Sequence, residues 1–396
     1  MKLLTKIKIE PREIISLIIL LVIGLLLGIQ SSLKAVKEQK RKDALDTAYS
    51  VVEAGKLIHL NEKIYKTVIY NEKSNLDYQG NSNAKFLLKI DRYQNASLSM
   101  WIDNQFCVKK ANNNSEIKIE DSKTSEQDCL NEQWNVTELL ANHELLEETA
   151  QTGYDKEIAF VSQKYYAGVD PNNYVIFSNA CFRIVNIANN NTVKIVYDSP
   201  ATSANTCGTG DGKLARLAWD QTESNDWDRP ATLRNVFDTW LDEENANNKI
   251  QALETDQLVA ASWYIGPLKL DNKTTLKNLV QLERSKISNH NAKLGLLNVS
   301  DYVKASTDIE CDTKKLLEEK NNACRLDNYL YQTNYPWFMN AVSDTKDRVY
   351  LLSKNGGIKA NSASEEQIVR PVAYLSSSIR LRGSGSASNP YLVVTE

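Results

Sequence analysis

The chain has 396 residues, 42% of them hydrophobic and 24% charged, and its formal net charge at pH 7 is −3. These are the values of an ordinary globular protein, which excludes disorder over most of the chain. Lys and Arg are interspersed with Asp and Glu and form no basic stripe, so we expect no nucleic-acid partner. The length is sufficient for two or three domains.

Residues 14–33 are the most apolar stretch of the chain, and from Ile14 to Ile29 the only polar residue is Ser16. A helix of about twenty residues spans a hydrocarbon core about 30 Å thick. We therefore expect a transmembrane helix over residues 14–33, after a basic cytoplasmic tail over residues 1–13. The alternatives are a buried core helix, disfavoured by the flanking Lys and Arg, and a cleaved secretory signal, disfavoured by the length of the run and the lack of an A-x-A site.

The six cysteines fall into three sequential pairs with short loops between the members of each pair. There is no C-x-x-C, so zinc-ribbon and thioredoxin sites are not expected. Three local disulfides on the oxidising side of a membrane fit the spacing, although six cysteines allow fifteen pairings and six free thiols in a cytosolic domain are the alternative. Basic residues flank both ends of the apolar run, so the positive-inside rule does not orient it; the cysteine pairs favour an internal N-terminus and an external bulk. The cysteines are Cys107, Cys129, Cys181, Cys207, Cys311 and Cys324.

Residues 34–66 are expected to continue as an amphipathic stalk helix, because apolar positions from Leu45 to Ile58 recur at steps of three and four. The succession ISLIILLVIGLLLGI and KDALDTAYSVVEAGKLIH resembles a type IV pilin. The resemblance implies a helix whose apolar half packs in a membrane or filament and whose amphipathic half lies under a small antiparallel sheet. Glu13 stands in for the family's Glu at the fifth mature position. Lys8 replaces the family's Gly at the processing site, so processing is left open.

Gly24 and Gly28 form a G-x-x-x-G pair inside the apolar run. This spacing lets two membrane helices approach closely, so self-association through these glycines is one hypothesis. Such pairs are also common by chance in apolar segments.

Residues 67–133 change to short strand-like runs separated by Asn-, Gly- and Ser-rich turns, which predicts a small antiparallel head. The sequence FCVKK, followed by a second cysteine, resembles the head of pilin-type surface proteins from low-GC Gram-positive bacteria. Residues 134–154 are expected to form a short helix and a linker.

Residues 155–396 are expected to form a larger domain with a hairpin near its start, a helix with Asp228 as N-cap, and strands at its end. This part resembles an uncharacterised extracellular domain of surface proteins in the same bacteria, which implies a fold akin to the C-type-lectin-like group. The fold class is thus α+β: a long transmembrane and amphipathic helix, a small pilin-like sheet and a larger disulfide-containing domain. The matching stretches are Tyr165–Val175, Phe182–Ile187, Leu233–Leu241, Leu258–Gly266, Glu283 with Arg284, Lys293–Tyr302, Asn328–Leu330, Val369–Leu375 and Asn389–Leu392.

Two clusters offer binding chemistry. Asp220, Glu223, Asp226 and Asp228 crowd one loop and supply the oxygen ligands that Ca²⁺ prefers, but the EF-hand spacing is absent and a solvated acidic loop is the simpler interpretation. We therefore expect no metal and no cofactor. The aromatic set Tyr329, Tyr331, Tyr335 and Trp337 can line a glycan or peptide site or belong to the core, and we favour the core. Arg370 is expected to pair with Glu283 or Asp301.

Catalytic motifs are missing from the sequence: there is no G-x-S-x-G or H-E-x-x-H, and GTGDGK lacks the phosphate-loop spacing. The sequence favours a non-enzymatic, single-pass protein of a bacterial cell membrane that displays an extracellular binding or adhesion domain. Its expected partners are the membrane, pilin-like subunits or itself, and an extracellular glycan or protein ligand. The alternatives are a membrane-tethered extracellular enzyme and a self-assembling structural or sensory membrane protein.

Overall fold

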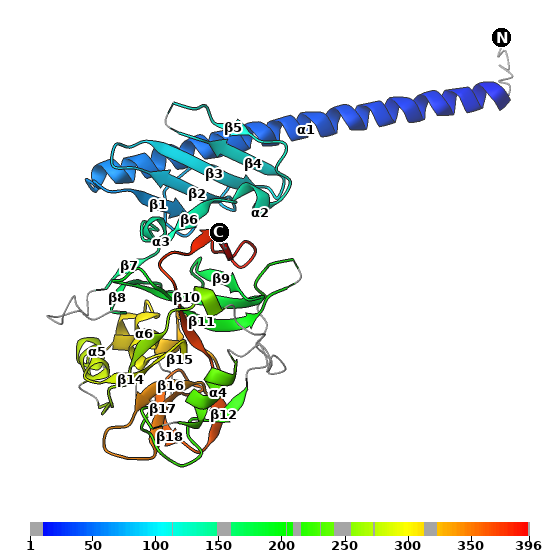
Figure 1. Ribbon diagram of the computed structural model, residues 1–396. Helices are drawn as coiled ribbons and strands as arrows, with labels where there is room; N and C mark the ends of the chain where they lie inside the picture. The colour runs from blue at the N-terminus through cyan, green and yellow to red at the C-terminus, as the bar shows by residue number, and fades with distance from the viewer. Residues whose placement is uncertain are drawn as a thin grey trace, which may run out of the picture.

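A rod-like helix, a small sheet and a larger α+β domain follow one another in the computed structural model (Figure 1). The structure describes residues 11–112, 114–148, 160–202, 204–208, 215–229, 231–240, 255–271, 274–312 and 323–394. The expected basic tail over 1–13 lies almost entirely outside these residues.

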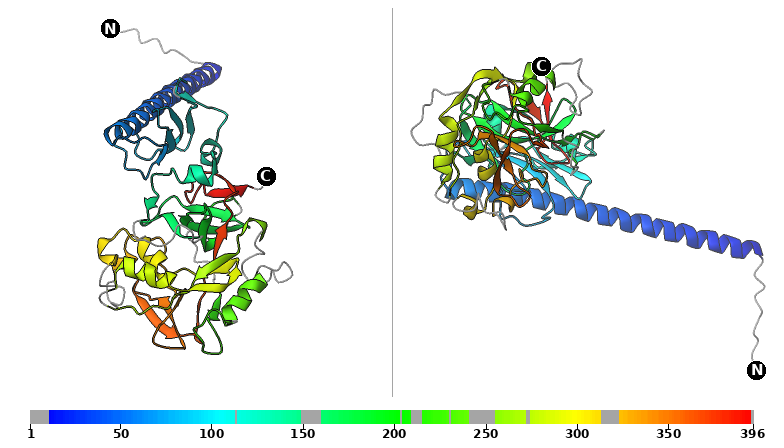
Figure 2. Two further views of the ribbon diagram at one scale, coloured as in Figure 1. Left: turned by 60° about the vertical axis from the view of Figure 1, so that its left-hand side comes forward. Right: turned by 90° about the horizontal axis from the view of Figure 1, so that it is seen from below.

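The helix α1 (Pro11–Asn61) runs for 51 residues without a break, as the two adjoining apolar patterns predict. It is the one helix among the described residues that is long and apolar enough to cross a membrane. Its N-terminal half projects away from the rest of the chain (Figure 2). Every side chain from Ile18 to Lys40 is exposed. The helix ends at Asn61 and not at residue 66, because the chain turns there toward the first strand.

The C-terminal half of α1 lies against one face of a five-stranded antiparallel sheet whose strands follow chain order. Ala44, Ala48, Val51 and Val52 are buried against that face. Gly55 belongs to the same stripe: an added Cβ would collide with the Leu88 side chain, so glycine permits the close approach. The strands are β1 (Val68–Asn71), β2 (Lys85–Ile90), β3 (Ala96–Ile102), β4 (Phe106–Lys110) and β5 (Lys118–Ile119).

The larger domain is built on a 10-stranded sheet in the order β15-β20-β11-β10-β9-β22-β21-β6, with β7 and β8 beside this path. At its centre, every residue of β10 is buried, so the strand is covered on both faces. Neighbours pair antiparallel except β22 and β9, which are parallel. The strands are β6 (Gln133–Asn135), β7 (Leu146–Glu147), β8 (Ser162–Tyr165), β9 (Tyr174–Phe177), β10 (Ala180–Ala188), β11 (Val193–Pro200), β15 (Leu294–Gly295), β20 (Val372–Leu375), β21 (Arg380–Arg382) and β22 (Tyr391–Val394).

The segment between the two domains contains the expected short helix and is more structured than the expected linker. It contains two four-residue helices, α2 (Glu126–Cys129) and α3 (Val136–Leu139), and it contributes β6 and β7 to the large sheet. The Trp134 indole donates to the Gly383 carbonyl at 2.8 Å, which fastens β6 beside β21. The large sheet therefore begins before residue 155.

Smaller elements cover the large sheet. The predicted helix near Leu233 is present, but Asp228 does not cap it: the Asp228 carboxylate accepts the backbone N–H of Asn289 at 2.8 Å. These elements are β12 (Arg216–Ala218), α4 (Thr232–Trp240), η2 (Thr255–Gln257), β13 (Ala261–Tyr264), α5 (Leu276–Arg284), β14 (Ile287–Ala292), α6 (Val299–Lys304), η3 (Ile309–Asp312), η4 (Ala323–Arg325), β16 (Trp337–Ala341), β17 (Arg348–Leu352), β18 (Ile358–Ser362) and β19 (Glu366–Ile368).

All six cysteines are paired in chain order, as Cys107–Cys129, Cys181–Cys207 and Cys311–Cys324. The prediction of three local disulfides is confirmed, and one of the fifteen conceivable pairings is selected. The first bond joins β4 to α2. It holds the start of the connecting segment against the small sheet.

Candidate functional site

A polar trough of about 450 Å³ opens on the face of the small sheet that points away from α1. Side chains alternate along a strand, so the residues between the buried apolar ones of β2, β3 and β4 point to this second face. The connecting segment forms the opposite wall, held there by the Cys107–Cys129 disulfide. The polar side chains that line it include Lys89, Ser97, Ser99, Lys109, Glu132 and Glu138.

Two ion pairs cross the trough from sheet to wall. Lys109 Nζ lies 3.1 Å from the Glu132 carboxylate, and Lys89 Nζ lies 3.2 Å from that of Glu138. Lys109 also donates to the Ser99 hydroxyl at 2.6 Å, and Ser99 in turn donates to Glu132. The result is a chain of alternating donors and acceptors facing an open space.

The electrostatics of the trough keep Glu132 ionised. Burial acts to raise its pKa, but the Ser99 hydroxyl and the Lys109 and Lys89 ammonium groups outweigh burial, so the pKa of Glu132 lies below its ordinary value. A carboxylate with a lowered pKa is a weak general base, and the other basic group beside Ser99, Lys109, is ion-paired with Glu132. The arrangement is suited to hydrogen-bonding a polar ligand.

The aromatic set is divided between core and surface. Trp337 is 2% exposed and donates to the Leu217 carbonyl, and Tyr329 is 8% exposed and donates to the Ile184 carbonyl. Tyr331 is half-buried and its hydroxyl donates to the Lys354 carbonyl, while Tyr335 is 36% exposed. Trp337 and Tyr329 are thus core residues, and the four side chains do not form one open aromatic surface.

The carboxylates of the acidic loop form ion pairs and hydrogen bonds with other residues of the protein. Asp226 and Asp228 each lie 3.2 Å from Lys286 Nζ. Asp220 is buried and accepts the backbone N–H and hydroxyl of Thr222. Glu223 accepts the hydroxyl of Ser364. Among the described residues no group of three or more His, Cys, Asp or Glu is placed to hold a metal ion, so the calcium candidate is not assembled.

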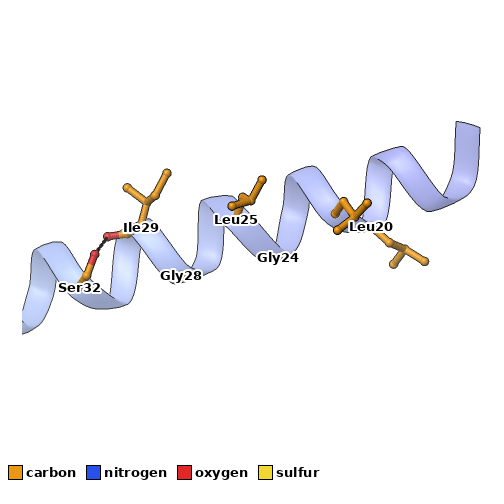
Figure 3. A pocket seen from close by; sticks show the side chains of 7 residues that line it. Leu20, Gly24, Leu25, Gly28, Ile29 and Ser32 are labelled. Atoms are coloured by element: carbon orange, nitrogen blue, oxygen red, sulfur yellow. Dashed lines mark hydrogen bonds between the residues drawn. The ribbon is translucent and has the colours of Figure 1, made fainter.

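Gly24 and Gly28 lie on one exposed side of α1, in a shallow groove bordered by Leu20, Leu25 and Ile29 (Figure 3). A Cβ added at either glycine would meet nothing within 4 Å. The groove is open to a neighbour, as the G-x-x-x-G hypothesis requires.

Arg370 pairs with neither expected carboxylate. It is buried, its guanidinium lies 3.9 Å from Asp198, and it donates to the carbonyls of Tyr197 and Leu330. Glu283 accepts the backbone N–H of Ser300, and Asp301 pairs with Lys194. Arg370 is an ion-paired residue, as predicted, but the predicted partners Glu283 and Asp301 were wrong.

The trough was missed from the sequence because its walls are far apart along the chain. The alternation of Lys and Ser with apolar residues in β2, β3 and β4 is the signal that would have revealed one wall. Nothing local reveals that Glu132 and Glu138 face it.

Comparison with protein-family models, with curated proteins and with solved structures yields no match for the chain. The structure itself defines the class: a mixed α+β protein with one long apolar N-terminal helix, antiparallel sheets and three disulfides.

Proposed function

We propose that the protein is a non-enzymatic, single-pass membrane protein that displays its two disulfide-bonded domains outside a bacterial cell. The helix and small sheet would form a pilin-like unit, and the larger domain, with a fold akin to the C-type-lectin-like group, would extend the displayed surface. The observation that carries this proposal is the division of α1 into an exposed apolar half and a half buried under the sheet.

The exposed half of α1 is incompatible with water as its solvent. Leu20, Leu25 and Leu27 are each at least 60% exposed, and other apolar side chains from Ile18 to Val36 are similarly bare. Burial stabilises a side chain of this size by about 1.5–3 kcal/mol. A bilayer removes the apolar side chains of residues 18–36 from water, and the helix is long enough to span a bilayer.

The disulfides support an external location for the domains. Each of the six cysteines is bonded, and disulfides persist on the oxidising side of a membrane and are rare in the cytosol. With one span, the N-terminus then lies inside and everything after α1 outside.

The trough supports binding over catalysis as the role of the small domain. Its ion-paired lysines, hydroxyls and carboxylates match the hydrogen-bonding groups of a glycan or of a polar protein segment.

The test is a topology and disulfide measurement on intact cells. A membrane-impermeant maleimide is applied with and without reductant, and the modified cysteines are mapped by mass spectrometry. We expect labelling of all six cysteines only after reduction. Labelling that requires permeabilised cells would place the domains inside and overturn the proposal.

The binding role has a separate test. Glu132→Gln removes the carboxylate charge from the trough, and Asp344→Asn, at an exposed surface ion pair, is the matched control. We expect an immobilised-glycan and surface-peptide screen to give ligands that the control retains and Glu132→Gln loses by tenfold or more, the scale of about 1.4 kcal/mol. Ligands that bind both variants equally would exclude the trough as their site.

A further inference from the structure

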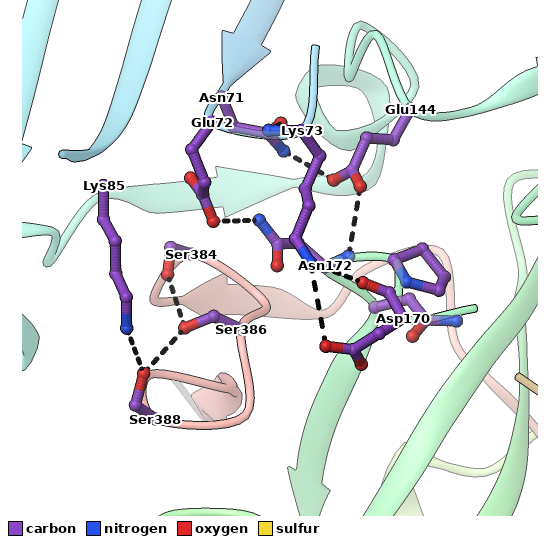
Figure 4. A network of polar contacts seen from close by, with 12 residues as sticks. Asn71, Glu72, Lys73, Lys85, Glu144, Asp170, Asn172, Ser384, Ser386 and Ser388 are labelled. Carbon is purple, nitrogen blue, oxygen red and sulfur yellow. Dashed lines mark hydrogen bonds and ion pairs between the residues drawn. The ribbon is translucent and has the colours of Figure 1, made fainter. Parts of the chain in front are cut away.

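The small sheet and the large domain meet at a polar joint beside the end of β1 (Figure 4). The Glu144 carboxylate lies at its centre. It accepts the Asn71 side-chain N–H at 2.5 Å from the small sheet and the Asn172 backbone N–H at 3.2 Å from the large domain. The Asn172 side chain crosses in the other direction and donates to Glu72 at 2.8 Å. Glu144 therefore ties both domains through hydrogen bonds alone.

The positive charges at the joint are directed to another carboxylate. Lys73 Nζ lies 3.7 Å from the Asp170 carboxylate and donates to the Asp170 carbonyl. Arg183 also contacts Asp170, at 3.5 Å. Ionised Glu144 thus accepts hydrogen bonds from two neutral donors, while the Glu72 charge opposes its ionisation and the Lys73 charge favours it.

The remaining groups near Glu144 do not compensate its charge. Behind it are the buried phenols of Tyr166 and Tyr391, whose pKa values are raised by burial, so both are neutral. His143, the preceding residue, has a pKa lowered mainly by burial and is neutral at neutral pH. Burial likewise raises the pKa of Glu144 itself to about 7, with a smaller contribution from Glu72, although the Asn71 and Asn172 hydrogen bonds and the Lys73 charge act to lower it.

We propose that this joint is a proton-sensitive clasp, which holds the two domains most firmly while Glu144 is protonated and loosens when Glu144 ionises. Opening the joint gives the carboxylate the water that the closed joint denies it. The clasp concerns how the domains are held together, so it depends neither on the ligand nor on the proposed membrane topology.

Proton linkage gives the direction in which pH changes the stability of the closed joint. Glu144 has a higher pKa in the closed joint, about 7, than the ordinary value of 4.5 that it regains when exposed. The closed joint therefore binds the proton more tightly, and its stability is complete below pH 4.5, falls from there to about pH 7, and is constant above. His143 acts in the opposite sense, because an open joint raises its proton affinity.

The test uses hydrogen–deuterium exchange of the full chain in detergent micelles, from about pH 4 to about pH 9, corrected for the intrinsic exchange rates. The peptides to follow cover the amides of Ile69, His143 and Asn172, which are bonded across or beside the joint. Glu144→Gln keeps the shape and cannot ionise. Glu53→Gln, at an exposed carboxyl of α1, is the control.

We expect the protection of the wild type, relative to Glu144→Gln, to fall by up to about tenfold per pH unit as Glu144 ionises and then to level off. The Glu53→Gln variant should follow the wild type. Subtracting the Glu144→Gln profile cancels the contribution of His143. A wild-type profile parallel to that of Glu144→Gln would overturn the clasp.

Glu72→Gln provides a second test if Glu144→Gln does not fold. Removing the neighbouring carboxylate lowers the pKa of Glu144, so protection should level off at a lower pH than in the wild type. An unchanged profile would contradict the role given to Glu144.

Discussion

At the scale of single residues, the large domain contains two lysines that are bonded to carboxylates away from water. Lys194 lies 2.6 Å from Asp301, with side chains 3% and 5% exposed, and Lys304 lies 2.7 Å from Glu148, with side chains 5% and 1% exposed. Asp301 also accepts the backbone N–H of Asn298 and so caps α6. Such pairs are costly to bury and more costly to break, because removing one partner leaves an uncompensated charge.

Lys194→Met should therefore be strongly destabilising. We expect a loss of about 3–5 kcal/mol in the free energy of unfolding, measured by urea denaturation. Lys269→Met removes an ammonium from an exposed pair whose side chains are 70% and 57% exposed, and should cost less than about 1 kcal/mol. Equal effects of the two substitutions would show that burial of the Lys194 pair has no energetic consequence.

Glu283 is the buried carboxyl with a raised pKa in the large domain. Burial raises its pKa to about 7, against the hydrogen bonds from Ser300 that act to lower it. The folded state therefore retains a proton that the unfolded chain loses above pH 4.5, so this carboxyl's contribution to stability declines from pH 4.5 to about pH 7.

Glu283→Gln removes this dependence. Its stability relative to the wild type should rise by roughly 3 kcal/mol across that interval and remain constant at higher pH. Denaturation of both proteins at a series of pH values measures the difference. A difference that is the same at every pH would mean that Glu283 titrates normally in the fold.

At the scale of elements, close packing of backbone on backbone decides several positions. Gly266 follows β13 and donates its N–H to the Glu283 carbonyl at 3.0 Å. A Cβ at this position would collide with the carbonyl oxygens of Leu282 and Glu283 at the end of α5. Neither carbonyl can move without disturbing the last turn of the helix.

Gly266→Ala should separate β13 from α5. Overpacking of this kind costs about 1–3 kcal/mol, and we expect the upper part of that range because the contacts are backbone atoms. Thermal unfolding followed by circular dichroism measures it. Gly24→Ala, where a Cβ meets nothing within 4 Å, should cause no such loss of stability.

At the scale of the whole molecule, the connecting segment makes the two domains interdependent. Trp134, Val136, Leu139 and Leu145 are all buried in the core of the large domain. The β1 strand in turn exchanges backbone hydrogen bonds with this segment, from Ile69 N–H to the Ala141 carbonyl and from His143 N–H to the Ile69 carbonyl.

A fragment covering residues 155–396 should consequently be unstable. It lacks β6, β7 and four buried apolar side chains, each of which stabilises by about 1.5–3 kcal/mol. A fragment covering residues 131–396 should fold and melt cooperatively. Equal melting temperatures would show that the connecting segment adds nothing to the large domain.

How far the fold follows from sequence depends on the range of the interactions. The unbroken α1 follows from an apolar run that adjoins an amphipathic helical pattern, and the small sheet follows from alternation within each strand. The cysteine pairs are close in sequence, so a local pairing was the simplest expectation. The tail at residues 1–13 and the linker beyond residue 148 lie mostly outside the described residues.

By itself, therefore, the sequence determined the long apolar helix, the division into a small and a large part, and the local disulfides, because each depends on neighbours along the chain. Only the tertiary structure decided that β6 joins the large sheet, that Asp198 is the partner of Arg370, and that Glu132 closes the trough. It alone also brought Glu72, Glu144 and Asp170 together at the joint. These contacts join residues far apart in sequence, and a single sequence carries no local pattern that specifies which distant side chain a buried charge will meet.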